Sequence, residues 1–141
     1  MRDEGTRAAT RVKRPGTRAP AVVVLCTAGS RTEAERLATA LVGERLAACV
    51  SLILPLRSVY RWRGRIERAR EVLLVIKTRR ALAARLITRV RALHSYEIPE
   101  VIALPIVAGS APYLAWLTTE TTQRRAALKS AAATRARRRR R

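Results

Sequence analysis

The apolar pattern from residue 20 onward changes from a strand-like to a helix-like spacing. The run Ala21–Ala28 is almost continuously apolar and rich in valine, which is typical of a buried strand. Ser30, with Glu33 three residues later, forms the capping-box signature of a helix start. The apolar residues that follow recur at the spacing of one helix face: Ala34, Leu37, Ala38, Leu41 and Val42. A strand followed by an amphipathic helix is therefore predicted.

Two long strands joined by a tight turn are predicted next. Cys49–Trp62 and residues 65–77 are rich in apolar and β-branched residues, and Arg63 and Gly64 supply the turn between them. Each strand has about twice the usual length of 5–6 residues, so the hairpin would extend beyond a small sheet. Open edges of such a ribbon must be covered or paired, which favours pairing with another copy of the chain.

The second half of the chain repeats the alternation. A helix is predicted from about Thr78, and a strand is predicted over residues 101–108. The buried face of the helix would hold Leu82, Leu86, Val90 and Leu93. Ser110 and Pro112 open a short C-terminal helix. The order β-α-β-β-α-β with an extra C-terminal helix predicts an α+β, ferredoxin-like sandwich.

The prolines test the order of the strands. Proline cannot donate to a ladder, so it occurs at sheet edges or at bulges. The second and fourth predicted strands contain Pro55 and Pro105, whereas the first and third contain none. An antiparallel sheet of order 4-1-3-2 places the two proline-free strands in the middle, so the pattern agrees with that order.

The net charge of +20 is concentrated towards the two ends of the chain. Residues 1–19 are polar and predict a flexible basic leader, and residues 20–122 form the predicted domain. Residues 123–141 are rich in arginine and alanine and predict a disordered tail or a frayed helix. Arginine outnumbers lysine 27 to 3, which indicates a compositional bias more than a surface built for nucleic acid. Non-specific contact with nucleic acid is expected only through the tail.

Cellular location is inferred from the apolar runs and the cysteines. The longest apolar runs are strand-sized, so no membrane partner is expected. Two cysteines form no disulfide framework, and the N-terminus lacks a secretory pattern. We therefore expect a cytoplasmic protein. An organelle transit peptide is the alternative, because the N-terminus is rich in arginine, although Asp3 and Glu4 count against it.

Few residues could carry chemistry, and we expect no enzyme. His94 is the single histidine, and a histidine at a helix C-terminus often compensates the helix dipole. Cys26 ends the first strand and Glu100 begins the fourth; together with His94 they would suit copper or zinc. Parallel pairing of the first and fourth strands, expected from βαβ connections, would separate Cys26 from Glu100 unless subunits share the site.

Six consecutive stretches resemble the CutA family of divalent-cation tolerance proteins. They read VLCTA (24–28), ERLAACV (44–50), SVYRWRGRI (58–66), EVLLVIKT (71–78), HSYEIPE (94–100) and YLAWL (113–117). They cover most of the predicted domain, residues 20–122, which is therefore CutA-like. Some members carry two histidines where this chain has Leu93 and His94, and Gly29 stands where a proline is common.

The resemblance implies a homotrimer whose long hairpins pair between neighbours, with a role in divalent-cation tolerance. It implies that copper or another divalent cation, neither of them obligatory, is bound by Cys26, His94 and Glu100. The alternative is a trimer that binds a small ligand or signals through a cleft between subunits. That cleft would use Tyr60, Trp62, Glu67, Glu71, Lys77 and Tyr96. Its aromatic residues could equally well pack the trimer.

Overall fold

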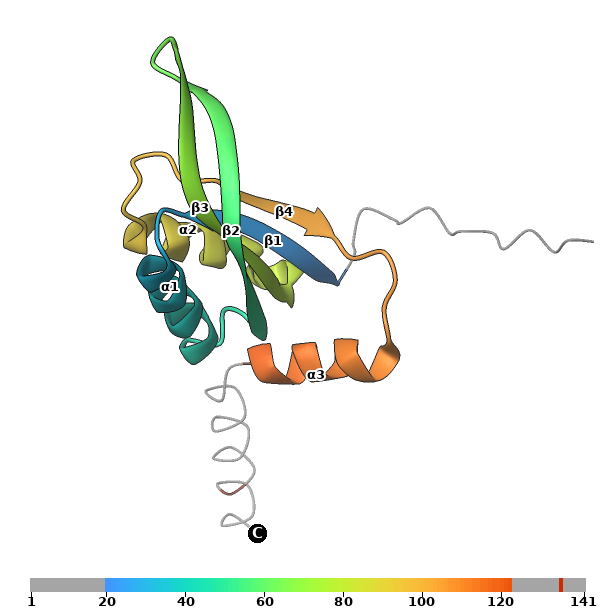
Figure 1. Ribbon diagram of the computed structural model, residues 1–141. Coiled ribbons are helices and arrows are strands. Elements are labelled where there is room, and N and C mark those ends of the chain that lie inside the picture. The colour runs from blue at the N-terminus through green and yellow to red at the C-terminus, as the bar shows by residue number, and fades with distance from the viewer. Residues whose placement is uncertain (1–19, 123–134, 136–141) are drawn as a thin grey trace, which may run out of the picture.

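Four antiparallel strands form one sheet, and helices pack against one of its faces (Figure 1). The computed structural model describes residues 20–122 and residue 135. The elements are β1 (Ala21–Ala28), α1 (Arg31–Gly43), β2 (Cys49–Trp62), β3 (Arg65–Arg79), a 3₁₀ turn (Arg80–Leu82), α2 (Ala83–Leu93), β4 (Val101–Pro105) and α3 (Ala111–Thr121). The predicted leader, and the predicted tail apart from residue 135, lie outside the described residues, so the tail's contact with nucleic acid stays a prediction.

The strand order is β2-β3-β1-β4, which confirms the predicted order 4-1-3-2 and the α+β class. The expected parallel pairing of β1 with β4 is wrong: the two strands are antiparallel, with Cys26 opposite Val101. The reason is the path of the second crossover. It makes β4 parallel to β3, and β1 lies between these strands and runs against both of them.

Three predicted boundaries move. The third strand continues to Arg79, and α2 begins only at Ala83, so the helix predicted from Thr78 starts five residues late. Thr78 stays in the strand because its buried Oγ1 donates to Leu46 O at 2.6 Å, a contact between distant parts of the chain. The fourth strand, predicted to reach residue 108, ends at Pro105, which has no N–H to donate.

The β2–β3 hairpin rises well beyond the rest of the sheet (Figure 1). Its strands of 14 and 15 residues confirm the predicted length. Arg63 and Gly64 have φ angles of 49° and 76°, as a two-residue hairpin turn requires. A register shift between Ile53 and Leu56 accommodates Pro55 in the edge strand.

One face of the sheet is closed by α1 and α2. Val24, Cys26, Leu74 and Ile76 point to this side and are fully buried. From the helices, the core receives Leu37, Leu41, Leu86 and Val90, which are also fully buried. These four are among the apolar positions that the helical spacing predicted, but Val42, which was predicted for the same face of α1, is 43% exposed.

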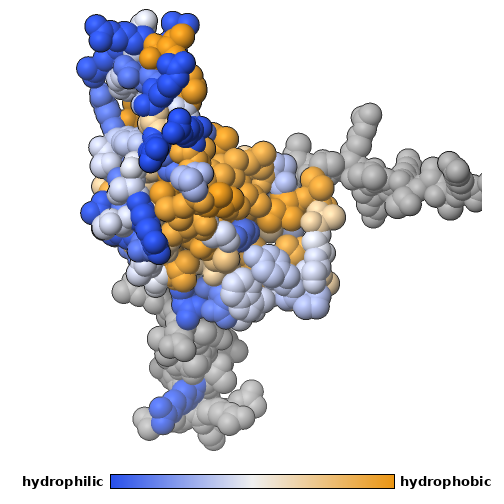
Figure 2. Space-filling model, in the orientation of Figure 1, coloured by the Kyte–Doolittle hydropathy of each residue, from blue (hydrophilic) through white to orange (hydrophobic). Residues whose placement is uncertain are grey.

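The opposite face of the sheet is apolar and largely uncovered, although Leu117 of α3 packs against Ala21 at one end of it. Ile53, Ile102 and Leu104 alternate with the core positions of their strands and remain 50%, 50% and 45% exposed. Figure 2 shows hydrophobic side chains gathered over the middle of this face. We call it the open face.

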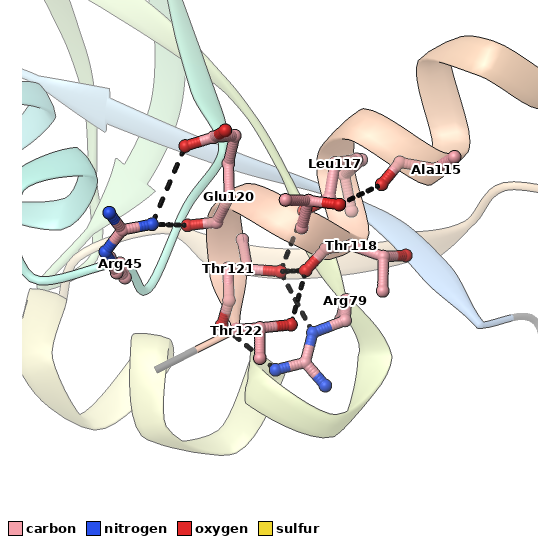
Figure 3. A network of polar contacts seen from close by, with 9 residues as sticks. Arg45, Arg79, Ala115, Leu117, Thr118, Glu120, Thr121 and Thr122 are labelled. Carbon is pink, nitrogen blue, oxygen red and sulfur yellow. Dashed lines mark hydrogen bonds and ion pairs between the residues drawn. The ribbon is translucent and has the colours of Figure 1, made fainter. Parts of the chain in front are cut away.

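The last helix, α3, is fastened to the end of the sheet by two arginines (Figure 3). Arg79 donates from Nε to Thr121 Oγ1 at 2.9 Å and from Nη2 to Thr121 O at 3.0 Å. Arg45 donates from Nη1 to Glu120 O at 3.1 Å. These cations meet the carbonyl end of the helix, where the dipole is negative. None of the helices among the described residues has the length and apolar character needed to cross a membrane.

Candidate functional site

A cavity of about 590 Å³ lies where the hairpin rises above the sheet, beside the segment that joins α2 to β4. It is lined by Thr27, Ser58, Val59, Tyr60, Trp62, Glu71, Tyr96, Glu97, Ile98 and Glu100. Four of the six residues predicted for an inter-subunit cleft are among them. The lining thus brings together three aromatic rings and three carboxylates, and it contains no lysine or arginine.

The other two predicted cleft residues lie elsewhere. Glu67 is opposite Tyr60 in the hairpin register but does not line the cavity. Lys77 lies near the far end of β3, where its Nζ donates to Ser51 Oγ at 2.7 Å and to Val75 O at 3.2 Å. Because β3 is long, Glu71 and Lys77 lie far apart although both belong to the same strand.

Tyr96 forms one wall of the cavity and is held from two sides. Its Oη donates to Glu71 Oε2 at 3.1 Å. Burial, followed by the bond to Glu71, raises the pKa of Tyr96 to about 12, so the hydroxyl stays protonated at neutral pH. Gly29 permits this position, because a Cβ there would lie 2.9 Å from Tyr96 Oη.

His94 positions the segment that carries Tyr96. The residue caps α2 through its backbone, but its ring bonds outside the helix. Nε2 lies 2.7 Å from Thr27 O, and Nδ1 accepts the Tyr96 N–H at 3.0 Å. Each ring nitrogen thus already has a partner, and Nδ1 also lies 3.4 Å from Glu33 Oε1. The expected role in compensating the helix dipole is thus replaced by a bridge between β1 and the cavity wall.

The sequence indicates only a capping role for Glu33. Ser30 Oγ does accept the Glu33 N–H at 3.1 Å, which confirms the predicted helix start. The Glu33 carboxylate, however, accepts from Ser95 N–H at 2.9 Å and from Ser95 Oγ at 2.8 Å. Burial raises the pKa of Glu33, but the two hydrogen bonds from Ser95, together with the nearby His94 and Arg36, outweigh it and leave the pKa below its ordinary value. A local motif could not reveal this long-range partner.

The backbones of the three predicted metal ligands lie close together, but their side chains do not converge. Antiparallel pairing places Cys26 opposite Val101, so Glu100 begins β4 beside the end of β1. Cys26 points into the core under the helices, whereas Glu100 lines the cavity on the other side. Burial, and after it the nearby carboxylates, raises the pKa of the Cys26 thiol to about 12, so no thiolate is ready to bind metal.

Within one protomer these residues do not fit a metal ion. Both His94 nitrogens have partners, and the Cys26 thiol is fully buried. Over residues 20–122 and residue 135, no group of three His, Cys, Asp or Glu side chains could hold a metal. Metal binding at these positions would need the side chains to rearrange or another subunit to contribute ligands.

Comparison with known proteins identifies relatives over most of the described chain. The family described as "CutA1 divalent ion tolerance protein" matches residues 22–120. A protein of Thermus thermophilus named "Divalent-cation tolerance protein CutA" is 48% identical over 99 residues, which cover 70% of this chain and 96% of that protein. The solved structure of the Thermus protein has a TM-score of 0.71 at 46% identity and covers 72% of this chain and 99% of that one.

Two further relatives bear on cellular location. A rice protein named "Protein CutA 1, chloroplastic" is 40% identical over 123 residues, covering 87% of this chain and 70% of that protein. The structure of an Archaeoglobus fulgidus protein described as a periplasmic divalent cation tolerance protein has a TM-score of 0.71 at 37% identity, covering 72% of this chain and 99% of that one. Relatives thus carry names from two compartments, and a cytoplasmic location for this chain stays a prediction.

Proposed function

This chain belongs to the CutA1 divalent ion tolerance protein family, and from that premise we propose that it is a homotrimer that binds a small ligand in the cavity beside Tyr96. It acts by binding and not by catalysis. The observation that carries the proposal is the cavity itself, whose walls are held in place by hydrogen bonds within the chain.

The open face supports assembly. Exposed apolar patches of this kind mark interaction surfaces in soluble proteins. Ile53, Ile102 and Leu104 are about half exposed in the isolated protomer, and Val59 and Ile66 are 63% and 59% exposed on the overhanging hairpin. A second and third copy of the chain would cover these residues and pair the open strand edges. The number three follows from the family resemblance.

The construction of the cavity supports ligand binding. Its volume of about 590 Å³ falls within the range of about 300–1,000 Å³ that is usual for small-molecule sites. The bonds of Tyr96 to Glu71 and to His94 order one wall before a ligand arrives. Such pre-organisation lowers the entropy cost of binding.

A ligand screen with a matched pair of variants tests this function. The full chain is screened by native mass spectrometry and thermal shift against cationic, neutral and anionic small molecules. Ser58→Trp places a large side chain in the cavity lining and should abolish binding while the trimer remains. Arg57→Trp, at the adjacent position of the same strand but outside the lining, should bind like the wild type. If no compound of any charge class binds, the ligand function is wrong.

Binding of copper or another divalent cation by Cys26, His94 and Glu100 is the second candidate function. It is favoured by the antiparallel register, which places the three residues at one corner of the sheet. Binding to the folded state would raise the melting temperature. Native mass spectrometry with and without copper reports subunit number and bound metal together. A melting curve that copper leaves unchanged in wild type and in Cys26→Ser would count against this candidate.

A further inference from the structure

We propose that the cavity selects a small organic cation, a molecule with an ammonium group and an apolar body. The inference rests on the proposed function, because it names the chemical class of the ligand for that same cavity. Three features of the cavity support it: the charge of the lining, the burial and hydrogen bonding of Glu71, and the placement of the aromatic rings.

The lining is acidic in a strongly basic chain. The whole protein has 30 basic and 10 acidic residues, yet the cavity is lined by three glutamates and by no lysine or arginine. A surface that merely followed the composition would carry more positive than negative groups. The local potential therefore favours a cation, and the low-dielectric walls strengthen that preference.

Glu71 offers a desolvated carboxylate to the ligand. The residue is only 8% exposed, and its Oε2 accepts from Tyr96 Oη. No described residue donates to the other oxygen, Oε1. No enclosed side-chain oxygen among the described residues lacks a partner, so Oε1 is accessible, and Glu71 lines the cavity. A carboxylate attracts a cation more strongly when bulk water is kept away, because less solvent screens the two charges.

The aromatic rings supply faces that attract a cation. Tyr60, Trp62 and Tyr96 all line the cavity. The chain contains its own example of this chemistry: the Arg63 guanidinium lies 5.5 Å from the centre of the Trp62 ring and 3.5 Å from Glu97 Oε2.

Arg63 does not neutralise the whole negative charge of the lining. Its side chain is 76% exposed and it pairs with Glu97, which leaves Glu71 and Glu100 for a ligand. Glu100 takes part in no hydrogen bond or ion pair within residues 20–122. A bare metal ion suits the cavity less well, since no group of three ligating side chains that could hold one exists in the described chain. Rings and separated carboxylates together fit an ammonium group with an apolar body.

Two molecules of the same shape separate charge from size. Choline and 3,3-dimethylbutan-1-ol differ in having nitrogen or carbon at the branched centre, so only choline is a cation. Binding is followed by calorimetry and by fluorescence of the full chain in a Trp116→Phe background, where Trp62 is the remaining tryptophan. Choline should bind once per protomer, about tenfold or more tighter than the neutral alcohol.

Paired substitutions locate the effect. Glu71→Gln removes a negative charge from the lining, so it should weaken choline about tenfold and leave the neutral alcohol unchanged. Glu67→Gln removes the same charge from the same hairpin outside the cavity and should change neither. If Glu71→Gln fails to fold, Glu100→Gln, on an exposed side chain, gives the same readout.

The outcomes distinguish this inference from the proposed function. Equal or tighter binding of the neutral alcohol overturns charge selection and leaves ligand binding intact. So does binding of neutral or anionic compounds in the screen when choline does not bind. Failure of every compound in every charge class overturns the proposed function and this inference together.

Discussion

The two faces of the sheet are built from alternating residues of the same strands, but only one of them is covered. Leu74 and Cys26 lie under α1 and α2 and are fully buried. Ile102 and Leu104 point to the other face of the same sheet and stay about half exposed. Apolar character is therefore not what distinguishes the faces. The difference is that the chain supplies a second layer for one face and leaves the other for a partner.

The same alternation separates the residues that could carry chemistry. Cys26 faces the covered side and Glu100 the cavity, although their strands pair directly. Closeness along a ladder does not bring side chains together when they point to opposite faces. The cavity forms instead where hairpin, sheet and loop meet on the uncovered side.

The largest difference between the faces should appear when the same leucine truncation is made on each. Leu74→Ala on the covered face should lower the free energy of unfolding by about 2–5 kcal/mol, because it leaves a cavity in a closed core. Leu104→Ala on the open face should weaken the trimer and change the unfolding of a separated protomer little. Denaturant unfolding and analytical ultracentrifugation measure the two effects. If Leu104→Ala leaves the assembly unchanged, the open face is not the interface.

Substitution by serine at two adjacent positions gives the next largest contrast: it introduces a hydroxyl at Cys26 and only removes a methyl group at Thr27. Cys26→Ser puts a hydroxyl into the apolar core and should cost about 1–3 kcal/mol. Thr27→Ser, one residue further and on the open side, should change stability by about 0.5 kcal/mol or less. Urea unfolding of the two variants is the measurement. Equal losses would mean that the core around Cys26 can satisfy a new hydroxyl.

The edge of the covered face should show a dependence on pH through Glu33. The folded-state pKa of Glu33 lies below its ordinary value of 4.5, so its stabilisation is complete above pH 4.5. It is lost as the pH falls through the lower folded-state pKa. Glu33→Gln should therefore be less stable at neutral pH, by about 1–2 kcal/mol.

The acid response of Glu33→Gln tests the same point. Between neutral pH and acid, stability should fall less in this variant than in the wild type. Glu35→Gln is the control, because Glu35 is exposed and pairs only with Arg31 one turn away. Melting curves from pH 7 to pH 3 decide the matter, and parallel pH profiles of wild type and Glu33→Gln would contradict the role of the Ser95 bonds.

The smallest effect involves no change in stability and compares the two cysteines. Cys49 lies on the open side of β2, opposite Lys77, and is half-buried, whereas Cys26 is fully buried with its thiol pKa at about 12. In the Leu104→Ala variant, Cys49 should react with iodoacetamide faster than in the wild-type trimer. Cys26 should stay unreactive in both until the protein unfolds. Peptide mass spectrometry reads the two sites separately, and early modification of Cys26 would refute its closed position.

Much of the fold could be predicted because its signals are local. The valine-rich run of β1, the Ser30 cap and the Arg63 and Gly64 turn each act within a few residues, and all three appear in the structure. The positions of Pro55 and Pro105 indicated the strand order, since a missing N–H restricts a residue wherever it occurs.

The errors in the predicted fold have non-local causes. The pattern predicts a helix from Thr78, but the structure keeps this residue in β3. Its hydrogen bond to Leu46 joins segments that are distant in sequence, so no local pattern indicates it. The predicted direction of β4 relative to β1 was wrong. The second crossover starts from β3, so it makes β4 parallel to β3 and antiparallel to β1. Ser95 as the partner of Glu33, and the gathering of Glu71 with Tyr96, required the strands and loops to be placed first.

The sequence by itself determined the elements, the class of the fold and the residue types available for a site. Those properties follow from side-chain chemistry and from spacings of a few residues. Only the tertiary structure decided which face each residue occupies in the finished sheet, and which residues meet. It placed Cys26 in a closed core, made His94 a support for Tyr96, and drew Glu71 and Glu100 into one cavity. The physical reason is that contacts between distant segments depend on strand direction and register, which no short stretch of the chain contains.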